Sequence, residues 1–444
     1  MTSLAVGLAE WAHSLRPSAD DLELADRALL DTVAVTLAAR DHRVAKLAAG
    51  LPEGARWAAA GLPEGARWAV AGHVLDFDDL HMQSTAHISA VCVPTALATG
   101  GGAGAYLAAA GVMARLGIAL GWAHYSAGWH ATCTAGAPAS AAGAAVALGL
   151  TAEQIATAIA LAVPGAGGVQ RAFGTDAKSL QVGFAVDAGI RAARLAAAGA
   201  RADPSALDAW LSLVGGNPAA AELSLADADP AAAELPLADA GRTDLAHRTD
   251  LTQLTDLTHL TDPAVPGGLA VKMYPCCYAL QRPISALAEL AAGTLDPGEV
   301  SRIVLRTPEA TVAPLIHHRP ETGLQAKFSL EYAAAAALLD RYPGFASFSD
   351  EAVRRQSARR LVDLVEIKLE PGGSWLLDGE LQAEVHTRCG EIRRISQRFP
   401  PGSPARPASA AQLQAKLTDC VTGLGVDPGS WSWRNAAQVL REHC

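Results

Sequence analysis

The stretch Ser140–Gln154 reads S-A-A-G-A-A-V-A-L-G-L-T-A-E-Q and spans the end of one helix and the start of the next. Its first part carries small apolar side chains at helical spacing and reaches Gly149, a residue that favours helix termination. Thr151 and Gln154 then form the pattern of an N-terminal capping box. The stretch predicts two consecutive helices, which can approach their neighbours closely because their side chains are small.

The same texture extends over most of the chain. Helices are predicted within residues 3–49, with a start near Pro17-Ser18, and almost continuously from 90 to 215. After Pro266 the pattern changes, and alternating apolar and polar residues predict strands at 300–307, 363–370 and 383–388. A helix is expected at 328–340, and the tail returns to helix. We therefore expect a mainly α fold with an α+β second domain: a helical domain at 1–266 and 400–444, and an α+β domain at 267–399.

Two segments repeat internally. The sequence L-P-E-G-A-R-W-A occurs at Leu51 and again at Leu62, which indicates a local duplication rather than a solenoid, because a solenoid needs at least three units. Residues 217–264 contain short repeats built on T-D-L, which we interpret as a low-complexity excursion between the domains.

Composition limits the class of protein. The chain has 444 residues and a net charge of −10, which argues against binding to nucleic acid or to an anionic membrane surface. No signal sequence and no run of about 18 apolar residues is apparent. Seven scattered cysteines, without zinc-ligand spacing, are typical of a reduced protein. We expect a cytoplasmic protein.

Residues 71–90 read A-G-H-V-L-D-F-D-D-L-H-M-Q-S-T-A-H-I-S-A and concentrate ionisable side chains in a poorly charged chain. Carboxylates next to imidazoles suit proton transfer or metal binding. The alternative is a solvated helix end with acidic capping residues. A divalent cation is a poor fit, because so few carboxylates do not make an oxygen cage. The cluster consists of Asp76, Asp78, Asp79, His73, His81 and His87.

Further candidates stand alone in the sequence. His130 occupies a turn before a small-residue helix, and Lys178 precedes the predicted helix at 182–198, whose N-terminal amides favour anions. Lys272 comes just before a Tyr-Pro turn at the domain boundary, where ligand clefts often form. Lys327 and Tyr332 could reach a shared cleft. Each of these side chains could instead be structural, and the chain has no nucleophile elbow, phosphate loop, zinc-protease motif or dinucleotide fingerprint.

Taken in order, these segments resemble the MmgE/PrpD family. The resemblance covers the chain except residues 217–264, and it rests on ordered motifs rather than on one. These are L-L-D-T-V-A-V from Leu29, H-V-L-D-F-D-D from His73, A-H-I-S from Ala86, G-W-H-A-T from Gly128, F-G-T-D-A-K from Phe173, K-M-Y-P-C-C from Lys272, and P-G-S-P-A-R-P-A-S from Pro401 with Lys416.

The resemblance implies an enzyme without a cofactor or metal that acts on a small polycarboxylate, that is, a di- or tricarboxylate. The family includes 2-methylcitrate dehydratase, cis-aconitate decarboxylase and iminodisuccinate epimerase. It also implies an all-helical domain, a smaller α+β lid domain and a homodimer. The active-site residues implied by position are Asp76, His87, His130, Lys178, Lys272 and Tyr332.

Carbanion chemistry beside a carboxylate suggests a role for each residue. Such a reaction needs a base for the α-proton, cations for the carboxylate and an acid for the leaving group. We assign His87 as the acid/base, with Asp76 orienting or tuning it. Lys178 and Lys272 would hold carboxylates from opposite sides of the cleft. His130 would assist and Tyr332 would donate a proton.

The chain departs from the family pattern at three places. Leu80 replaces a threonine, His87-Ile-Ser89 replaces His-Pro-Ser with one extra residue before it, and Gln181 replaces a histidine. The loss of a hydroxyl and an imidazole suggests a smaller or more apolar acid than a tricarboxylate.

The sequence therefore predicts a hydro-lyase that removes water next to a carboxylate. A decarboxylase or an epimerase could use the same residues. A carboxylate-binding homologue without activity and a metal-dependent hydrolase are the alternatives from other classes.

Overall fold

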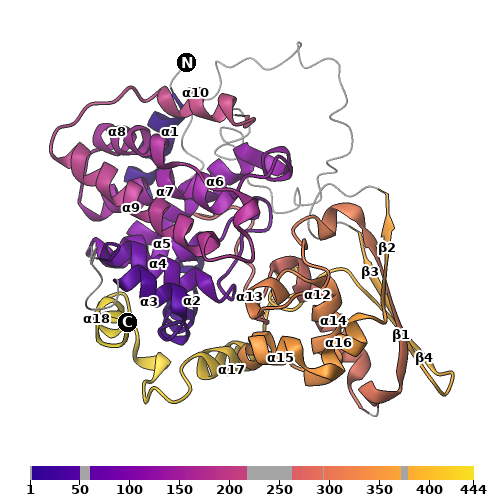
Figure 1. The fold of residues 1–444 in the computed structure, drawn as a ribbon. Coiled ribbons are helices and arrows are strands. Elements are labelled where there is room, and N and C mark those ends of the chain that lie inside the picture. The colour runs from indigo at the N-terminus through magenta and orange to yellow at the C-terminus, as the bar shows by residue number, and fades with distance from the viewer. Residues whose placement is uncertain (1–2, 51–60, 218–262, 294, 372–378) are drawn as a thin grey trace, which may run out of the picture.

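The computed structural model describes residues 3–50, 61–217, 263–293, 295–371 and 379–444. The first half of the chain is helical (Figure 1). Its helices are α1 (Leu4–Ser14), α2 (Ala19–Ala38), α3 (Arg43–Ala49), α4 (Glu64–Val74), α5 (Ile88–Ala98), α6 (Ala103–Ser126), α7 (Ala131–Ala147), α8 (Ala152–Ala162), α9 (Ala177–Ala197) and α10 (Ala206–Leu213). The 3-10 turns η1 (Val163–Gly165) and η2 (Gln170–Ala172) connect α8 to α9.

Close helix packing in this half depends on residues without a large side chain. A β-carbon at Gly189 of α9 would lie 2.6 Å from the carbonyl oxygen of Ala137 in α7. A β-carbon at Gly143 of α7 would lie 2.6 Å from that of Ala109 in α6. Both distances are shorter than a normal contact, so the glycines are what allow α6, α7 and α9 to pack this tightly.

Helix α6 is the most apolar long element. By length and hydropathy alone it could cross a membrane, but 83% of its apolar window is buried inside the protein. Burial of this kind is also found in the central helix of a soluble protein, and α6 packs against α5 and α7.

The second half combines short helices with one sheet. Its helical elements are η5 (Tyr278–Leu280), α12 (Gln281–Ala291), η6 (Pro297–Glu299), η7 (Glu309–Val312), α13 (Gly323–Ala326), α14 (Leu330–Asp340), η8 (Phe345–Phe348), α15 (Asp350–Arg354) and α16 (Gln356–Val362). The strands β1 (Val300–Pro308), β2 (Val365–Glu370), β3 (Leu381–Thr387) and β4 (Ile392–Gln397) form a sheet in the order β2-β1-β3-β4. Strands β1 and β2 are parallel, and the other pairs are antiparallel.

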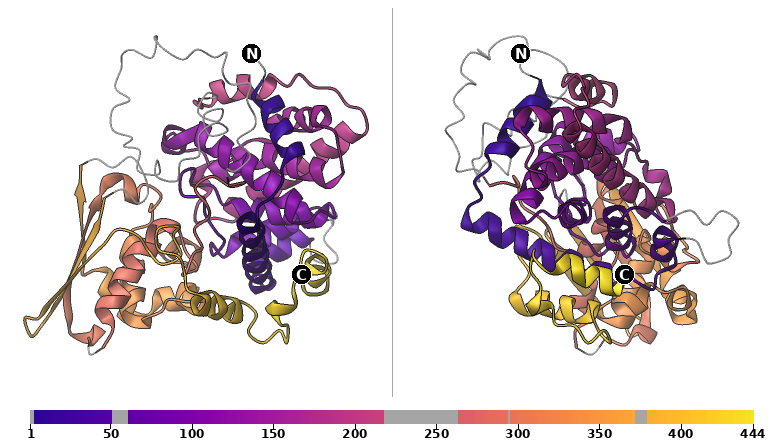
Figure 2. Two further views of the ribbon diagram at one scale, coloured as in Figure 1. Left: turned by 180° about the vertical axis from the view of Figure 1, so that it is seen from behind. Right: turned by 90° about the vertical axis from the view of Figure 1, so that its left-hand side faces the viewer.

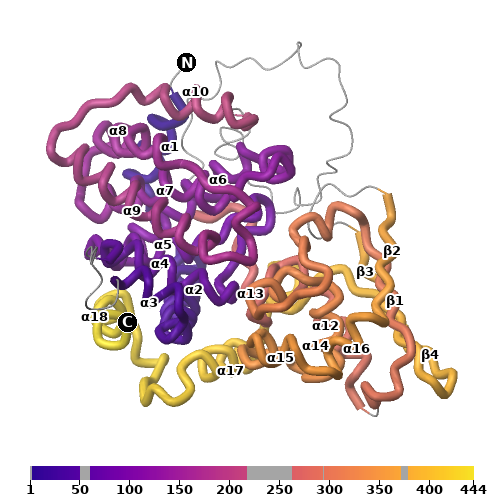
Figure 3. Tube along the Cα trace, viewed as in Figure 1, coloured from indigo at the N-terminus to yellow at the C-terminus, as the bar shows by residue number. Residues whose placement is uncertain are grey.

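The sheet lies at the outer edge of the molecule, and α12, α14 and α16 lie between it and the helical half (Figures 1 and 2). The chain then returns to the helical half through α17 (Ala410–Cys420), η9 (Pro428–Ser430) and α18 (Ala436–His443), as the tube in Figure 3 makes clear. Helices α17 and α18 both pack against α2. Residues 76–80 and 270–277 therefore meet where the two halves join, and an isolated bridge pairs Leu80 with Ala270.

The mainly helical fold with an α+β second part is confirmed. The capping box predicted at Thr151 forms, and the helix start expected near Ser18 is confirmed and also has a capping box. Helix α9 begins earlier than predicted, so Lys178 lies in its first turn rather than before it. Strand β4 was not predicted. The first copy of the duplicated segment and nearly all of the 217–264 repeats lie outside the described residues.

Candidate active site

The segment after α4 has a strained start. Asp76 has a φ of 55°, a left-handed conformation that aspartate tolerates better than most residues. Three consecutive backbone carbonyls around it each accept a hydrogen bond from a buried lysine. Lys327 binds the carbonyl of Leu75, Lys272 binds that of Asp76 at 3.0 Å, and Lys416 binds that of Phe77 at 2.8 Å. These ammonium groups hold a backbone conformation that the local sequence would not keep by itself.

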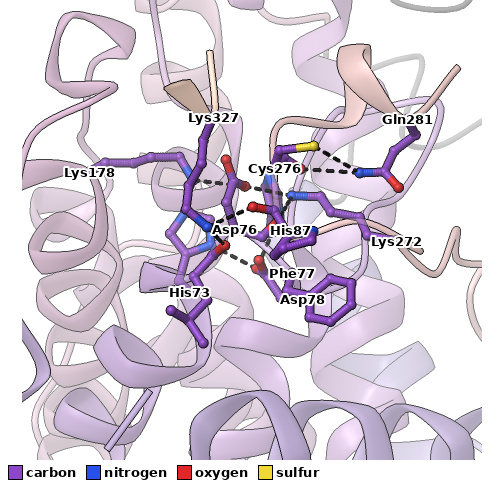
Figure 4. A network of polar contacts seen from close by, with 12 residues as sticks. His73, Asp76, Phe77, Asp78, His87, Lys178, Lys272, Cys276, Gln281 and Lys327 are labelled. Atoms are coloured by element: carbon purple, nitrogen blue, oxygen red, sulfur yellow. Dashed lines mark hydrogen bonds and ion pairs between the residues drawn. The ribbon is translucent and has the colours of Figure 1, made fainter. Parts of the chain in front are cut away.

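The Asp76 carboxylate is the centre of a buried charge cluster (Figure 4). Its Oδ1 atom accepts from Lys272 Nζ at 2.6 Å and from Lys178 Nζ at 3.2 Å, and the two lysines approach from opposite sides. Burial opposes ionisation of Asp76, but the ammonium groups of Lys178 and Lys272 outweigh it and hold the pKa of Asp76 well below its usual value. Oδ2 of Asp76 is buried without a hydrogen-bond partner among the described residues.

A second carboxylate, Asp78, lies between two histidines. Its Oδ2 atom is 2.7 Å from Nδ1 of His73 and 3.0 Å from Nδ1 of His87. The contact with His73 is a hydrogen bond, whereas the contact with His87 is too bent to be one in this conformation. Nε2 of His73 accepts from Lys178 Nζ at 2.9 Å. Burial lowers the pKa of His87 to about 3, although Asp78 opposes the shift, so the His87 ring is neutral near pH 7.

His130 precedes α7 and is fully buried. Its Nδ1 atom lies 2.6 Å from the side-chain nitrogen of Gln181 and 3.3 Å from the sulfur of Cys133. Its Nε2 atom is buried without a hydrogen-bond partner in the described part of the chain. Burial lowers the pKa of His130 well below its usual value, so this ring is also neutral.

These side chains meet at one small cavity. The space inside it that is open to water is about 20 Å³, which is room for about one water molecule. The charged and imidazole groups occupy part of the wall, and apolar and aromatic groups make up most of the rest. The lining residues are Asp76, Leu80, Thr85, His87, Tyr125, His130, Phe173, Lys178, Cys277, Tyr278 and Phe328.

Comparison with protein families accounts for this arrangement. Residues 6–210 match the MmgE/PrpD N-terminal domain, and residues 274–432 match the MmgE/PrpD C-terminal domain. The chain belongs to the MmgE/PrpD family. No curated protein matches the chain at a significant level. The two MmgE/PrpD matches cover most of the chain, and the cavity is lined by residues from both of them.

The structure gathers most of the residues that the MmgE/PrpD resemblance implied. Four of the six line the cavity, namely Asp76, His87, His130 and Lys178, and so does Leu80, where the chain departs from the family pattern. Lys272 is not on the cavity wall; it lies behind Asp76, fully buried, and binds its carboxylate and carbonyl. In this conformation its ammonium group neutralises Asp76 and does not face the cavity.

Three expectations about individual side chains need correction. The Tyr332 hydroxyl donates to the carbonyl of Ser347 and does not line the cavity, because the buried face of α14 turns it into the core of the second half. Asp76 was expected to orient or tune His87, but its carboxylate is bound by lysines, and Asp78 is the carboxylate in contact with that ring; a charge interaction between Asp76 and His87 remains. Gln181 does not remove a polar partner, because its amide contacts His130.

Other residues of the site were not singled out from the sequence. His73 and Asp78 were recognised as members of a cluster, but their pairing depends on how the chain turns after α4. Lys327 was noted only as a neighbour of a possible cleft. Phe173 and Phe328 face the cavity from the two halves of the chain and stack at 5.3 Å between ring centroids.

His73, Asp78 and His87 are also spaced so that one atom from each lies within 4.8 Å of the others, as in a metal site. Both ring nitrogens of His73 are already engaged, by Asp78 and by the Lys178 ammonium group. A cation here would face that ammonium at close range, which is unfavourable. The donor set therefore fits a hydrogen-bonded network better than a metal ion.

Asp79 lies next to these groups but faces another way. Its carboxylate accepts hydrogen bonds from the backbone nitrogen and the hydroxyl of Ser89, in the first turn of α5. Burial raises the pKa of Asp79 to about 7, although the bonds from Ser89 oppose the shift. Asp79 thus anchors the helix that directly follows His87.

The raised pKa of Asp79 predicts a pH dependence of stability. The unfolded chain releases this proton near pH 4 and the folded chain near pH 7, so the free energy of unfolding should fall as the pH rises through that window. Urea unfolding at about pH 5 and about pH 8 measures the fall. Asp79→Asn should reduce the difference between the two pH values by on the order of 1–4 kcal/mol.

The control for this prediction is Asp41→Asn, which changes an exposed carboxylate whose pKa is lowered by Lys46. It should leave the difference between the two pH values unchanged. An equal change in both variants would show that Asp79 is not the titrating group.

Proposed function

We propose that this MmgE/PrpD protein is a cofactor-independent lyase that removes water from a small hydroxycarboxylate after abstraction of the α-proton. Family membership supports a carboxylate enzyme of the dehydratase, decarboxylase or epimerase type. The proposal depends on one observation: the neutral His87 and His130 rings and the Lys178 ammonium group, which is hydrogen-bonded to Asp76, line the same cavity.

The described groups suggest how the steps divide. Lys178 lies on the cavity wall and can bind the substrate carboxylate while Asp76 holds it in place. The Lys178 ammonium group, once bound to the substrate carboxylate, also stabilises the negative charge that spreads onto this carboxylate when the α-proton leaves. His87 lines the cavity with its Nδ1 atom turned toward Asp78, so Nε2 is the atom available to take the proton.

The proton on His87 has a clear destination. Once the C–H electrons have moved to the enolate, the C–O bond of the β-hydroxyl breaks, and the protonated His87 returns its proton to the departing oxygen. The products are an unsaturated acid and water, and His87 is neutral again. One base that acts twice in this way needs the hydroxyl and the α-hydrogen on the same face of the substrate.

Charge and lining favour a substrate with one carboxylate near the lysines. The charged groups around Asp76 are counted without the neutral histidines His87 and His130. They are the ammonium groups of Lys178, Lys272 and Lys327 and the carboxylates of Asp76 and Asp78. Burial lowers the pKa of Lys327 to about 8, so it is mainly charged at pH 7. These groups include one more ammonium than carboxylates, so one substrate carboxylate can be neutralised. A second substrate carboxylate would be buried without a counter-charge from this set.

The remaining walls suit an apolar substituent. Leu80, Phe173 and Phe328 are apolar, and Leu80 stands where the family usually has threonine. We therefore expect a hydroxy acid with an alkyl or aromatic group to be preferred over a tricarboxylate.

A substrate panel in D₂O tests the proposal. Hydroxy- and unsaturated mono-, di- and tricarboxylates are incubated with the enzyme and followed by NMR and mass spectrometry, with His87→Gln prepared in parallel to detect contaminating activity. Loss of water from a monocarboxylate is the expected result. Loss of CO₂ would show a decarboxylase, and deuterium at the α-carbon without loss of mass an epimerase. Stabilisation by an acid without turnover would show a binding homologue.

A further inference from the structure

The two cavity histidines have different neighbours at Nδ1, and these neighbours fix where each ring carries its proton. His87 faces the Asp78 carboxylate, which can only accept a hydrogen bond when ionised. Burial opposes ionisation of the Asp78 carboxylate. Its interactions with the His73 and His87 rings outweigh burial and hold the pKa of Asp78 well below its usual value, so the carboxylate is ionised. The attraction of this ionised oxygen, 3.0 Å away, places the hydrogen of a neutral His87 on Nδ1, although the contact is too bent for a hydrogen bond in this conformation.

His130 faces donors instead of an acceptor. The side-chain nitrogen of Gln181 lies 2.6 Å from its Nδ1 atom, and the Cys133 sulfur lies 3.3 Å away. Burial raises the pKa of Cys133 far above its usual value, so this residue is a thiol, which can donate to Nδ1 beside the Gln181 amide. Nδ1 of His130 must therefore be the unprotonated nitrogen, and the hydrogen lies on Nε2.

The orientation of the Gln181 amide is fixed by the backbone. Its oxygen accepts from the nitrogen of Val169 at 3.1 Å, and its nitrogen donates to the carbonyl of Val169 at 3.3 Å. A flipped amide would place oxygen against oxygen and nitrogen against nitrogen at both contacts. The same nitrogen can then only donate to His130.

We infer that Asp78 and Gln181 hold the two cavity histidines in opposite tautomers, with His87 presenting a bare Nε2 atom and His130 presenting an Nε2–H group. The inference rests on the proposed function for its catalytic consequence. His87 then carries the proton, whereas His130 is a fixed hydrogen-bond donor to the oxygen on which negative charge develops. A neutral imidazole suits this second role, because it donates without first having to be charged. The buried Nε2 atom of His130 has no partner among the residues that the structure describes, and it is the donor left for the substrate.

Gln181 is thus a positioning residue, and its replacement of a family histidine keeps a donor at this place. Removing one such donor from the reaction typically lowers kcat by about 10²–10³. Gln181→Glu is the sharpest change, because a carboxylate can still accept from Val169 but can only accept from His130. The variant should move the His130 hydrogen to Nδ1 and turn Nε2 into an acceptor.

The experiment is ¹⁵N NMR of the imidazole rings in the full-length, ligand-free protein, which distinguishes protonated from bare ring nitrogens. The chain has 13 histidines, so the signals are assigned by their loss in His130→Gln and His87→Gln. The wild type should show bare Nδ1 for His130 and bare Nε2 for His87. Gln181→Glu should reverse the His130 pattern and lower kcat by about 10²–10³, with a much smaller change in KM.

Two controls separate tautomer from general disturbance. Gln170→Glu alters an amide in the same loop whose nitrogen donates to the carbonyls of Tyr125 and Trp129 and not to the His130 ring. Asp78→Asn should disturb the His87 pattern, whereas Asp41→Asn, a change at an exposed carboxylate paired with Lys46, should not. Bare Nε2 on His130 in the wild type, or an unchanged His130 pattern in Gln181→Glu, would overturn the inference. Because the spectra need no turnover, failure of the substrate panel would count against the proposed function and not against the tautomers.

Discussion

Replacement of His87 by glutamine should lower kcat by about 10²–10⁴, the usual contribution of a positioned acid or base. Glutamine keeps a polar side chain of similar reach but cannot take the α-proton. The measurement is the turnover of whichever acid the panel identifies, together with the rate of α-deuterium exchange. Both should fall together, because the same atom removes the proton and returns it.

The matched control is His81→Gln. His81 is buried six residues earlier, and its ring nitrogens contact the Ser84 hydroxyl and the Pro266 carbonyl, away from the cavity lining. This variant should affect stability more than turnover. Near-normal turnover in His87→Gln, or equal losses in both variants, would remove His87 from the role of acid/base.

Replacement of Lys272 by methionine should destabilise the protein by about 3–5 kcal/mol, because it leaves the buried Asp76 carboxylate short of a counter-charge. Lys272 has no exposed surface and binds both the carboxylate and the carbonyl of Asp76. Denaturant unfolding measures the loss. Adding Asp76→Asn, which removes the charge and tolerates the left-handed backbone, should recover part of it.

Lys368→Met provides the comparison. Lys368 pairs with Glu366 at 3.1 Å on the surface of the sheet, where both side chains are more than a third exposed. An exposed pair of this kind contributes at most about 1 kcal/mol. A loss in Lys272→Met no larger than in Lys368→Met would show that Lys272 does not compensate the Asp76 charge.

The elements that the sequence predicted well are those whose signals are local. The capping boxes at Ser18 and Thr151 mark their helices because each motif satisfies amides within one turn. Strand β4 lacks such a signal, since Ile392-Arg393-Arg394-Ile395 does not alternate and the strand forms by pairing with β3. The sequence did not predict the first turn of α9, because residues 177–181 have neither a capping box nor a hydrophobic period of their own.

The candidate site divides in the same way. The family motifs indicated His87, His130 and Lys178, but not which groups touch them. The choice between Asp76 and Asp78 as the partner of His87 depends on the turn at Asp76, and the position of Tyr332 depends on which face of α14 packs inward. The sequence marks Gln181 only as a departure from a family histidine, and its contact with His130 depends on α9 and the loop at Val169 lying side by side.

The lysine contacts of the Asp76 segment bear on how such a site could be transferred or divided. The peptide carbonyls of Leu75, Asp76 and Phe77 are bound by side chains that follow them by 252, 196 and 339 residues in sequence. The conformation of the loop that carries the acidic motif thus depends on lysine side chains from much later in the sequence. Grafting the motif onto another helical scaffold would transfer its amino-acid sequence without its conformation. A fragment that ends before Lys272 would contain the motif but not the site.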